Sequence, residues 1–278
     1  MRQRVVDLTV LVGEWLLDRL DRVIARASTL GDPAFFSNDD FLWSYGLEAN
    51  WTIIRQELDE VLRYRDELPN FQDISTDQET ITDDDRWKTF FLYGFGFRSN
   101  TNCELCPETT RLVESVPGMK TAMFSILAPG KHIPDHNGPY KGIVRYHLAL
   151  KVPELGEHCR IRVGEEIVSW VEGESLIFDD TYEHEVWNDT EDERAVLFLD
   201  VVRPLRFPMN VLNGLVITAI ARSPFISDAK RRHLEWEERF AAARRGRLPA
   251  VPRRTAAKLA TRGPRDEPGR HELHDIRG

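Results

Sequence analysis

The sequence predicts a mainly β protein, with a core that is a β-sandwich or barrel of jelly-roll type and with flanking α-helices at both ends. Between residues 119 and 203, short β-branched or aromatic runs are separated by Gly, Pro and acidic turns. No helical pattern interrupts these runs, which favours an antiparallel sandwich or barrel over a parallel sheet. The predicted strands are 122–127, 143–152, 159–163, 167–171, 175–178, 184–187 and 195–202.

Helical patterns precede this core. Apolar residues recur at helical spacing over 5–27, with charged residues between them, so residues 1–46 are expected to form an amphipathic helix and a loop. A second helix is expected at 50–64, because an apolar stripe ends before Pro69. It opens the main domain, 47–243, whose jelly-roll core spans about 119–203.

Two further helices, at 211–221 and 228–243, are expected after the core. Residues 244–278 hold ten Lys/Arg and four Asp/Glu, which makes this segment +6 and leaves −15 for the rest of a chain of net charge −9. The basic segment has few large apolar residues and is expected to be a disordered tail. The acidic body argues against nucleic acid as a partner, because such binding needs a basic face.

No membrane-spanning segment is expected. The apolar run 8–17 is interrupted by Gly13 and Glu14 and is shorter than the roughly 20 residues that a span needs. Three cysteines are too few for a disulfide framework and indicate a reducing compartment. We therefore expect a cytoplasmic protein, with peripheral membrane association through the first helix as the alternative.

Two histidines are candidate metal ligands. His136 stands beside an Asn-Gly-Pro turn, and His184 follows 48 residues later, after the acidic turn Asp179-Asp180. Two imidazoles that a β-barrel brings together suit iron, zinc, copper or nickel, and their spacing does not choose among these metals. Taken singly, a histidine is more often structural or exposed than a metal ligand, so the prediction depends on the pair.

A third protein ligand is missing from the pattern. Non-haem iron sites usually add a carboxylate two residues after the first histidine, where this chain has Gly138. Asp135 should point to the opposite face of an extended strand. Asp180 either orients a bound water as an outer acceptor or, with Asp179, simply forms the turn.

Four polar residues are candidates for binding an anion. Arg194 precedes an apolar strand, and its planar guanidinium suits a carboxylate. Arg145 and His147 leave the same face of one strand, and Ser125 lies on a neighbouring run. These groups would be costly to bury without an anionic ligand, unless they lie at a wet rim.

Several long motifs in order resemble the aspartyl/asparaginyl β-hydroxylase family, which includes bacterial members related to the lipid A hydroxylases. They are HNGPYKGIVRYHLAL at 136–150, CRIRV at 159–163 and FDDTYEHEVW at 178–187. LPNF at 68–71 and WKTFFLY at 87–93 extend the resemblance, which covers about 47–200.

The resemblance implies an oxygenase domain whose core is a double-stranded β-helix (jelly roll, cupin-like). Such a domain uses iron(II), molecular oxygen and 2-oxoglutarate to hydroxylate an unactivated carbon. His136 and His184 would hold the metal, with water in place of the usual carboxylate, and Asp180 would orient that water. The missing third ligand is therefore expected for this family.

The same resemblance assigns the anion-binding residues to 2-oxoglutarate. Arg194 and Ser125 would bind its distal carboxylate, whereas Arg145 and His147 would face its metal-bound end.

The substrate is left open by one departure. The animal enzyme has a basic residue two positions before Arg145, where this chain has Ile143, and we expect that position on the substrate side. The expected substrate is thus an aspartyl/asparaginyl-like residue in a peptide, an amino acid derivative or an acyl chain. The alternatives are a catalytically silent cupin-like binding module and a metal-bound cupin enzyme that needs no oxo-acid, and two arginines near two histidines argue against both.

Overall fold

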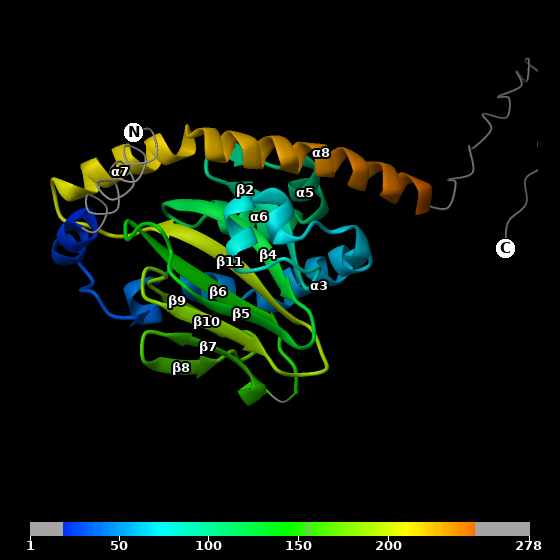
Figure 1. The fold of residues 1–278 in the computed structure, drawn as a ribbon, viewed down its shortest axis with the longest axis horizontal. Helices are drawn as coiled ribbons and strands as arrows, with labels where there is room; N and C mark the ends of the chain where they lie inside the picture. The colour runs from blue at the N-terminus through cyan, green and yellow to red at the C-terminus, as the bar shows by residue number, and fades with distance from the viewer. Residues whose placement is uncertain (1–18, 155, 248–278) are drawn as a thin grey trace, which may run out of the picture.

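The computed structural model describes residues 19–154 and 156–247, which form two antiparallel sheets with helices around them (Figure 1). In spatial order, the larger sheet holds β1 (Phe35–Phe36), β9 (Ser175–Phe178), β6 (Ile143–Lys151), β11 (Arg194–Val202), β4 (Met119–Leu127), β2 (Trp87–Gly94) and β3 (Phe97–Arg98). The smaller sheet holds β5 (Lys131–His136), β10 (His184–Asn188), β7 (Cys159–Val163) and β8 (Glu166–Ser169).

The connections are those of a double-stranded β-helix. Within the larger sheet β4 pairs with β11 and β6 with β9, whereas β5 pairs with β10 and β7 with β8 in the smaller one. The chain therefore passes repeatedly between the sheets, which share one hydrophobic core. This topology confirms the predicted jelly roll, from Met119 to Val202, although the two described sheets stay separate and do not close into a barrel.

Strand β5 was not predicted, because its sequence contains a proline and two histidines. Pro134 lies where the ladder between β5 and β10 shifts register, between the pairs Ile133–Val186 and His136–His184. A bulge tolerates a residue that cannot donate to the ladder. Strands β1, β2 and β3, which widen the larger sheet, were also missing from the predicted core.

Helices cover the larger sheet. They are α2 (Ser44–Glu48), α3 (Trp51–Leu62), α4 (Phe71–Ile74), α5 (Asn100–Leu105), α6 (Pro107–Glu114), α7 (Met209–Ala221) and α8 (Pro224–Arg247), with short 3₁₀ turns η1 (Asn38–Asp40), η2 (Arg65–Glu67), η3 (Thr76–Thr80) and η4 (Gly156–His158). The predicted helix at 50–64 is α3, which buries the stripe Ile54, Leu58 and Val61. The two predicted C-terminal helices are α7 and α8, which run along one side of the molecule (Figure 1).

The predicted terminal segments are only partly within the described residues. Residues 19–27 are helical, and the rest of the expected N-terminal helix lies outside the description. The expected tail lies outside it as well, except that residues 244–247 continue α8. In the part of the chain that is described, no single helix is long and apolar enough to cross a membrane. Taken together, α7 and residues 224–244 are long and apolar enough, but the two helices are bent by 51° at the break between them.

Candidate active site

The seven residues that the sequence analysis assigned to the metal and to 2-oxoglutarate line one cavity of about 390 Å³. They are Ser125, His136, Arg145, His147, Asp180, His184 and Arg194. The cavity takes residues from both sheets, so the jelly roll brings together positions that are far apart in the sequence.

The two candidate metal ligands face each other across paired strands. His136 ends β5, His184 begins β10, and the two residues are register partners whose ring centroids lie 4.0 Å apart. Side chains alternate along β10, so His184, Val186 and Asn188 are buried. Asp135 is exposed and does not line the cavity, as its place next to His136 predicted.

Each of the two imidazoles has one nitrogen fixed by the backbone. His136 Nδ1 lies 2.8 Å from the carbonyl oxygen of Pro134, and His184 Nδ1 lies 3.0 Å from that of Tyr182. A carbonyl only accepts, so each Nδ1 carries the proton and each Nε2 keeps a free lone pair. Backbone contacts of this kind orient histidines that bind metals.

Both histidines are uncharged at neutral pH. Burial lowers the pKa of His136. Burial, the neighbouring His136 and Arg145 lower the pKa of His184 to about 3. Neutral imidazole is the form that binds a metal, so the pair can act as ligands without first losing a proton.

Asp180 occupies the space beside Gly138 where a third ligand would otherwise project. The backbone N–H of Gly138 donates to the carbonyl oxygen of Asp180 at 2.6 Å, and a Cβ at position 138 would collide with the Asp180 carboxylate. Asp180 is fully buried, and burial raises its pKa to about 6 even though Arg145 acts in the opposite direction. The glycine is therefore required by the packing of the acidic turn.

Arg145 has protein partners. Its Nη2 lies 2.8 Å from Asp180 Oδ2 and 3.3 Å from Asp200 Oδ1, and its guanidinium lies over the Phe198 ring at 4.5 Å. The expectation that an anionic ligand must satisfy Arg145 is wrong, because two carboxylates already do so. Its position near the metal-bound end of 2-oxoglutarate stays a prediction.

Arg194 differs from Arg145. It is 2% exposed, its guanidinium lies 4.3 Å from the centre of the Trp170 ring, and burial lowers its pKa to about 10. Within the described residues, its Nε and Nη1 are buried with no hydrogen-bond partner, and the Cys159 thiol lies beside the guanidinium. A buried cation with unused donors is costly, which favours a site made for an anion.

Two further polar groups stand near Arg194. Ser125 Oγ accepts a hydrogen bond from Trp87 Nε1 at 3.0 Å, so its own O–H remains able to donate. Both ring nitrogens of His147 are buried without a partner in the described chain. Burial, together with Arg194 and Arg145, lowers the pKa of His147 well below its usual value and keeps the ring neutral.

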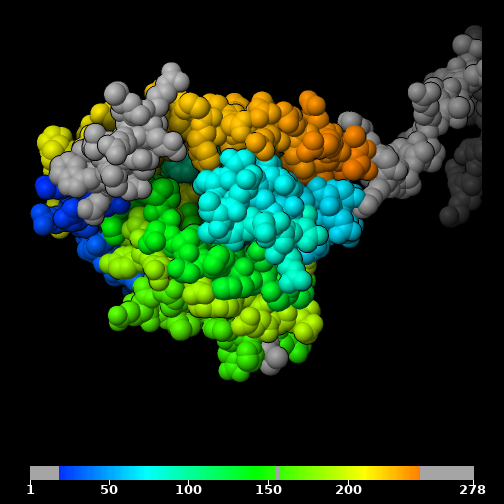
Figure 2. Space-filling model, in the orientation of Figure 1, coloured from blue at the N-terminus to red at the C-terminus, as the bar shows by residue number. Residues whose placement is uncertain are grey.

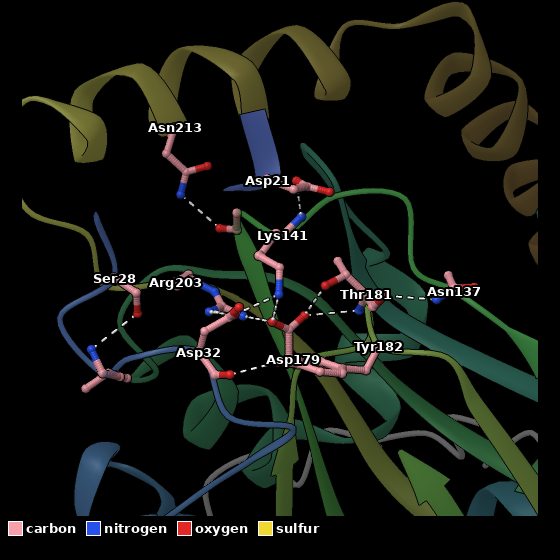
Figure 3. A network of polar contacts seen from close by, with 12 residues as sticks. Asp21, Ser28, Asp32, Asn137, Lys141, Asp179, Thr181, Tyr182, Arg203 and Asn213 are labelled. Carbon is pink, nitrogen blue, oxygen red and sulfur yellow. Dashed lines mark hydrogen bonds and ion pairs between the residues drawn. The ribbon is translucent and has the colours of Figure 1, made fainter. Parts of the chain in front are cut away.

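A buried ionic network fixes the turn between Asp179 and His184 (Figure 3). The Asp179 carboxylate is bound by Arg203 and by Lys141 Nζ at 2.7 Å, and Lys141 also pairs with Asp32 at 2.7 Å. Burial alone would raise the pKa of Asp179, but the two cations outweigh it and lower that pKa. The ionised carboxylate holds the turn that carries both Asp180 and His184.

Several functional neighbours were not predicted from the sequence. Trp87, Trp170 and Asp200 contact the candidate residues only because of sheet register and packing. Ile143, expected on the substrate side, does not line the cavity. It is packed in a separate apolar cluster with Tyr140 and Leu205, so that interpretation is wrong.

The residues present fit a two-histidine metal site with an anion beside it. Among residues 19–154 and 156–247, no group of three or more His, Cys, Asp and Glu is placed to hold a metal. The protein donors are then the two free Nε2 atoms, and other ligands must come from water or from a bound anion. The unused donors of Arg194 offer that anion a charged partner in the same cavity.

This fold and cavity define a jelly-roll protein in which a histidine pair and a buried arginine line one cavity. Residues 48–204 match the family described as aspartyl/asparaginyl beta-hydroxylase. The chain belongs to this family of hydroxylases, and the resemblance inferred from the motifs is confirmed.

Two relatives are of particular use. The chain is 48% identical over 217 residues to the ornithine lipid ester-linked acyl 2-hydroxylase of Rhizobium tropici, covering 78% of this chain and 77% of that protein. It is 36% identical over 163 residues to the aspartyl/asparaginyl beta-hydroxylase of Homo sapiens, covering 57% of this chain but 21% of the human protein. Hydroxylases of lipid and of amino acid residues are therefore both represented among its relatives.

Solved cupin structures resemble part of the chain. A cupin domain of an XRE family transcriptional regulator from Enterobacter cloacae covers 42% of this chain at 13% identity and a TM-score of 0.30, with 96% of that domain matched. A predicted oxalate decarboxylase from Thermotoga maritima covers 42% at 12% identity and a TM-score of 0.29, with 80% of its chain matched.

Proposed function

We propose that this chain is an iron(II)- and 2-oxoglutarate-dependent hydroxylase that acts on the acyl chain of a lipid. The observation that carries the proposal is the buried guanidinium of Arg194, whose Nε and Nη1 have no hydrogen-bond partner in the described chain, in the same cavity as His136 and His184. Two neutral imidazoles suit iron(II), and a buried arginine with unused donors suits the far carboxylate of an oxo-acid.

The two histidines would hold the metal through Nε2. Their Nδ1 contacts to backbone carbonyls keep both rings in the required tautomer. When bound, iron(II) and 2-oxoglutarate supply the oxidising chemistry, in which one oxygen atom of O₂ enters a C–H bond and the other enters succinate as carbon dioxide is released. The protein supplies position and electrostatic field.

Arg194 and Ser125 would hold the distal carboxylate of 2-oxoglutarate. Arg194 offers a charge-assisted bond from a planar fork, and Ser125 adds its O–H while Trp87 fixes the Oγ. Water would stabilise the positive charge of Arg194 less than a carboxylate would, because the site is buried. Neutral His147 would add one uncharged donor at the metal-bound end of 2-oxoglutarate.

Asp180 would hold a water next to the histidine pair. Its carboxyl lies against Gly138, next to His136, and has a pKa raised to about 6. At neutral pH it is therefore largely ionised and accepts hydrogen bonds, and Arg145 limits the cost of its buried charge.

An acyl substrate agrees with the rest of the cavity wall. Much of the lining is aromatic or aliphatic, contributed by Phe71, Ile81, Ile133, Ile161, Phe178, Val186 and Phe198. Apolar walls favour a hydrocarbon next to the reacting centre. The Rhizobium tropici relative, which acts on an ester-linked acyl chain of ornithine lipid, supports the same choice.

The test is a hydroxylation assay with iron(II), 2-oxoglutarate and an ester-linked acyl lipid. We expect the lipid to gain one oxygen atom, with one succinate released per product, and His184→Ala to abolish both. His132→Ala is the matched control, since His132 is exposed on β5 and pairs with Glu185 outside the cavity. Equal product from wild type and His184→Ala, or no succinate from folded, iron-loaded wild type, would sink the proposal.

A further inference from the structure

A second cavity, of about 120 Å³, lies beside the active site. Phe71, Arg145 and Phe198 line both cavities, so the two meet at these side chains. The second cavity has no part in the roles derived above for the metal or for 2-oxoglutarate. We call it the tail pocket.

The tail pocket is suited to hydrocarbon. Its apolar lining comes from Phe71, Ile74, Phe91, Phe95, Phe97, Met123, Phe198, Phe225, Ile226 and Ala229. The two charged residues in its wall, Arg145 and Asp200, pair with each other at 3.3 Å. A ligand bound there gains mainly from leaving water, and a charged or strongly polar ligand would find little compensation.

The tail pocket reaches the surface at the corner between α7 and α8. Phe225, Ile226 and Ala229 belong to the first two turns of α8, and Phe225 is 42% exposed although it lines the pocket. An apolar side chain that faces both a pocket and the surface marks an apolar route between them.

The surface at that corner is itself apolar. Phe207, Val211 and Leu215, spaced four residues apart, are 82%, 55% and 63% exposed. No charged residue occurs between Arg206 and Arg222, both of which are exposed. Figure 2 shows α8, in orange, along the upper edge of the molecule.

The exposed apolar side chains at this corner would be more stable against a lipid surface than in bulk water. Phe207, Val211 and Leu215 form an exposed apolar stripe, and such a stripe leaves water when it enters the acyl boundary of a bilayer. Arg206 and Arg222 lie at the two ends of this stripe. The arginines would meet anionic headgroups while the stripe enters the acyl boundary. Asn213 fastens α7 to the core by donating from Nδ2 to the carbonyl oxygen of Gly142 at 2.8 Å, so α7 is held at this corner (Figure 3).

We propose that the α7–α8 corner docks on a lipid bilayer and that the tail pocket takes the hydrocarbon chain of the substrate lipid. The inference rests on the proposed function and adds the route and binding site of the chain. At roughly 30 Å³ for a group the size of a water molecule, the pocket holds about four methylenes. The rest of a longer chain would leave along Phe225 toward the bilayer.

The pocket is tested by binding, with methyl propanoate, methyl butanoate and methyl hexanoate as probes. These esters lack a carboxylate and so do not compete for Arg194. In titration calorimetry we expect affinity to rise up to about fourfold per methylene until the pocket is filled. Ala229→Leu should weaken methyl hexanoate about tenfold or more and methyl propanoate less.

Ala242→Leu is the matched control, because it makes the same change at an exposed position of the same helix. It should bind the three esters as wild type does. Affinity that does not depend on chain length, or equal behaviour of the two leucine variants, overturns the tail pocket.

The docking surface is tested by sedimentation with vesicles of phosphatidylcholine, with and without phosphatidylglycerol. Wild type should bind, more tightly to the anionic vesicles, and Leu215→Glu should lower the partition coefficient about tenfold. Ile167→Glu is the control, because Ile167 is 59% exposed on β8, at the opposite side of the molecule from α7 (Figure 1). Wild type that stays in solution would overturn docking, including the case in which residues 1–18 or a second copy covers α7.

Neither readout needs turnover, so the two proposals fail separately. Protein that binds esters and vesicles but hydroxylates no lipid contradicts the proposed function alone. Lipid hydroxylation without chain-length dependence contradicts the tail pocket alone.

Discussion

The lack of a side chain at Gly138 leaves the space in which the Asp180 carboxylate lies. A side chain there would occupy the space that the Asp180 carboxylate fills. Position 138 thus lacks the usual carboxylate ligand, and an acidic side chain from a different loop fills the space. A third protein ligand at 138 and Asp180 in its present place exclude each other on steric grounds.

Substituting Gly138 tests this packing. Gly138→Ala should force Asp180 from its position, lower the free energy of unfolding by about 1–3 kcal/mol, and reduce turnover. The measurement is urea unfolding together with the hydroxylation assay. Gly46→Ala is the control, since a Cβ there meets nothing within 4 Å and, in α2, should stabilise by about 0.5–1 kcal/mol. Equal stability of the two alanine variants would show that the carboxylate is not confined.

At the scale of residues, the sequence predicted which side chains line the site but not which side chains they contact. Arg145 and Arg194 look alike in the sequence, yet one lies between two carboxylates and the other has unused donors. The difference depends on Asp200, which is the register partner of Arg145 across β6 and β11. No local pattern indicates such a pairing.

At the scale of elements, α8 is anchored by a histidine that has no polar partner. His233 is fully buried, both of its ring nitrogens lack hydrogen-bond partners in the described chain, and its ring packs against Phe91, Phe97 and Trp236. Burial lowers its pKa from 6.5 to about 4. The neutral ring therefore belongs to the folded state, and protonation favours detachment of α8.

This predicts how stability depends on pH. Above pH 6.5 His233 is neutral in both states and its contribution is complete, whereas between pH 6.5 and about 4 only the unfolded chain takes up the proton. The loss over that window is about 3 kcal/mol, at 1.36 kcal/mol per pKa unit. When urea unfolding is measured across this window, the free energy of unfolding should fall by about that amount less in His233→Leu than in wild type.

His158→Leu serves as the control, because His158 is exposed and lies in a 3₁₀ turn. It should keep the pH dependence of wild type. An unchanged dependence in His233→Leu would mean that α8 does not depend on this neutral ring.

The elements that could be predicted were those with strong periodicity. The helices α3, α7 and α8 and most core strands follow from apolar spacing alone. Strand β5 could not be predicted, because Pro134 and the polar residues around it are stabilised by a bulged ladder with β10. The element that carries His136 is therefore defined by its partner strand and not by its own sequence.

At the scale of the whole molecule, the site is held by segments from across the chain. The network around Asp179 joins Asp32 near the start of the described residues, Lys141 after β5 and Arg203 after β11 (Figure 3). Burying several charges in one network is costly unless each one is paired. The same network lies between α7 and the turn that carries His184 (Figure 3).

The central claim is that two histidines and Arg194 together hold iron(II) and 2-oxoglutarate. The most direct measurement is an anaerobic titration with both, following the visible charge-transfer band of their chelate in wild type, Arg194→Met and Arg162→Met. Arg162 is the control because it forms ion pairs with Glu183 and Glu185 outside the cavity. We expect the band in wild type and in Arg162→Met, and a 2-oxoglutarate affinity at least about 30-fold weaker in Arg194→Met. No band in folded, iron-loaded wild type, or equal affinity in Arg194→Met, would contradict the account.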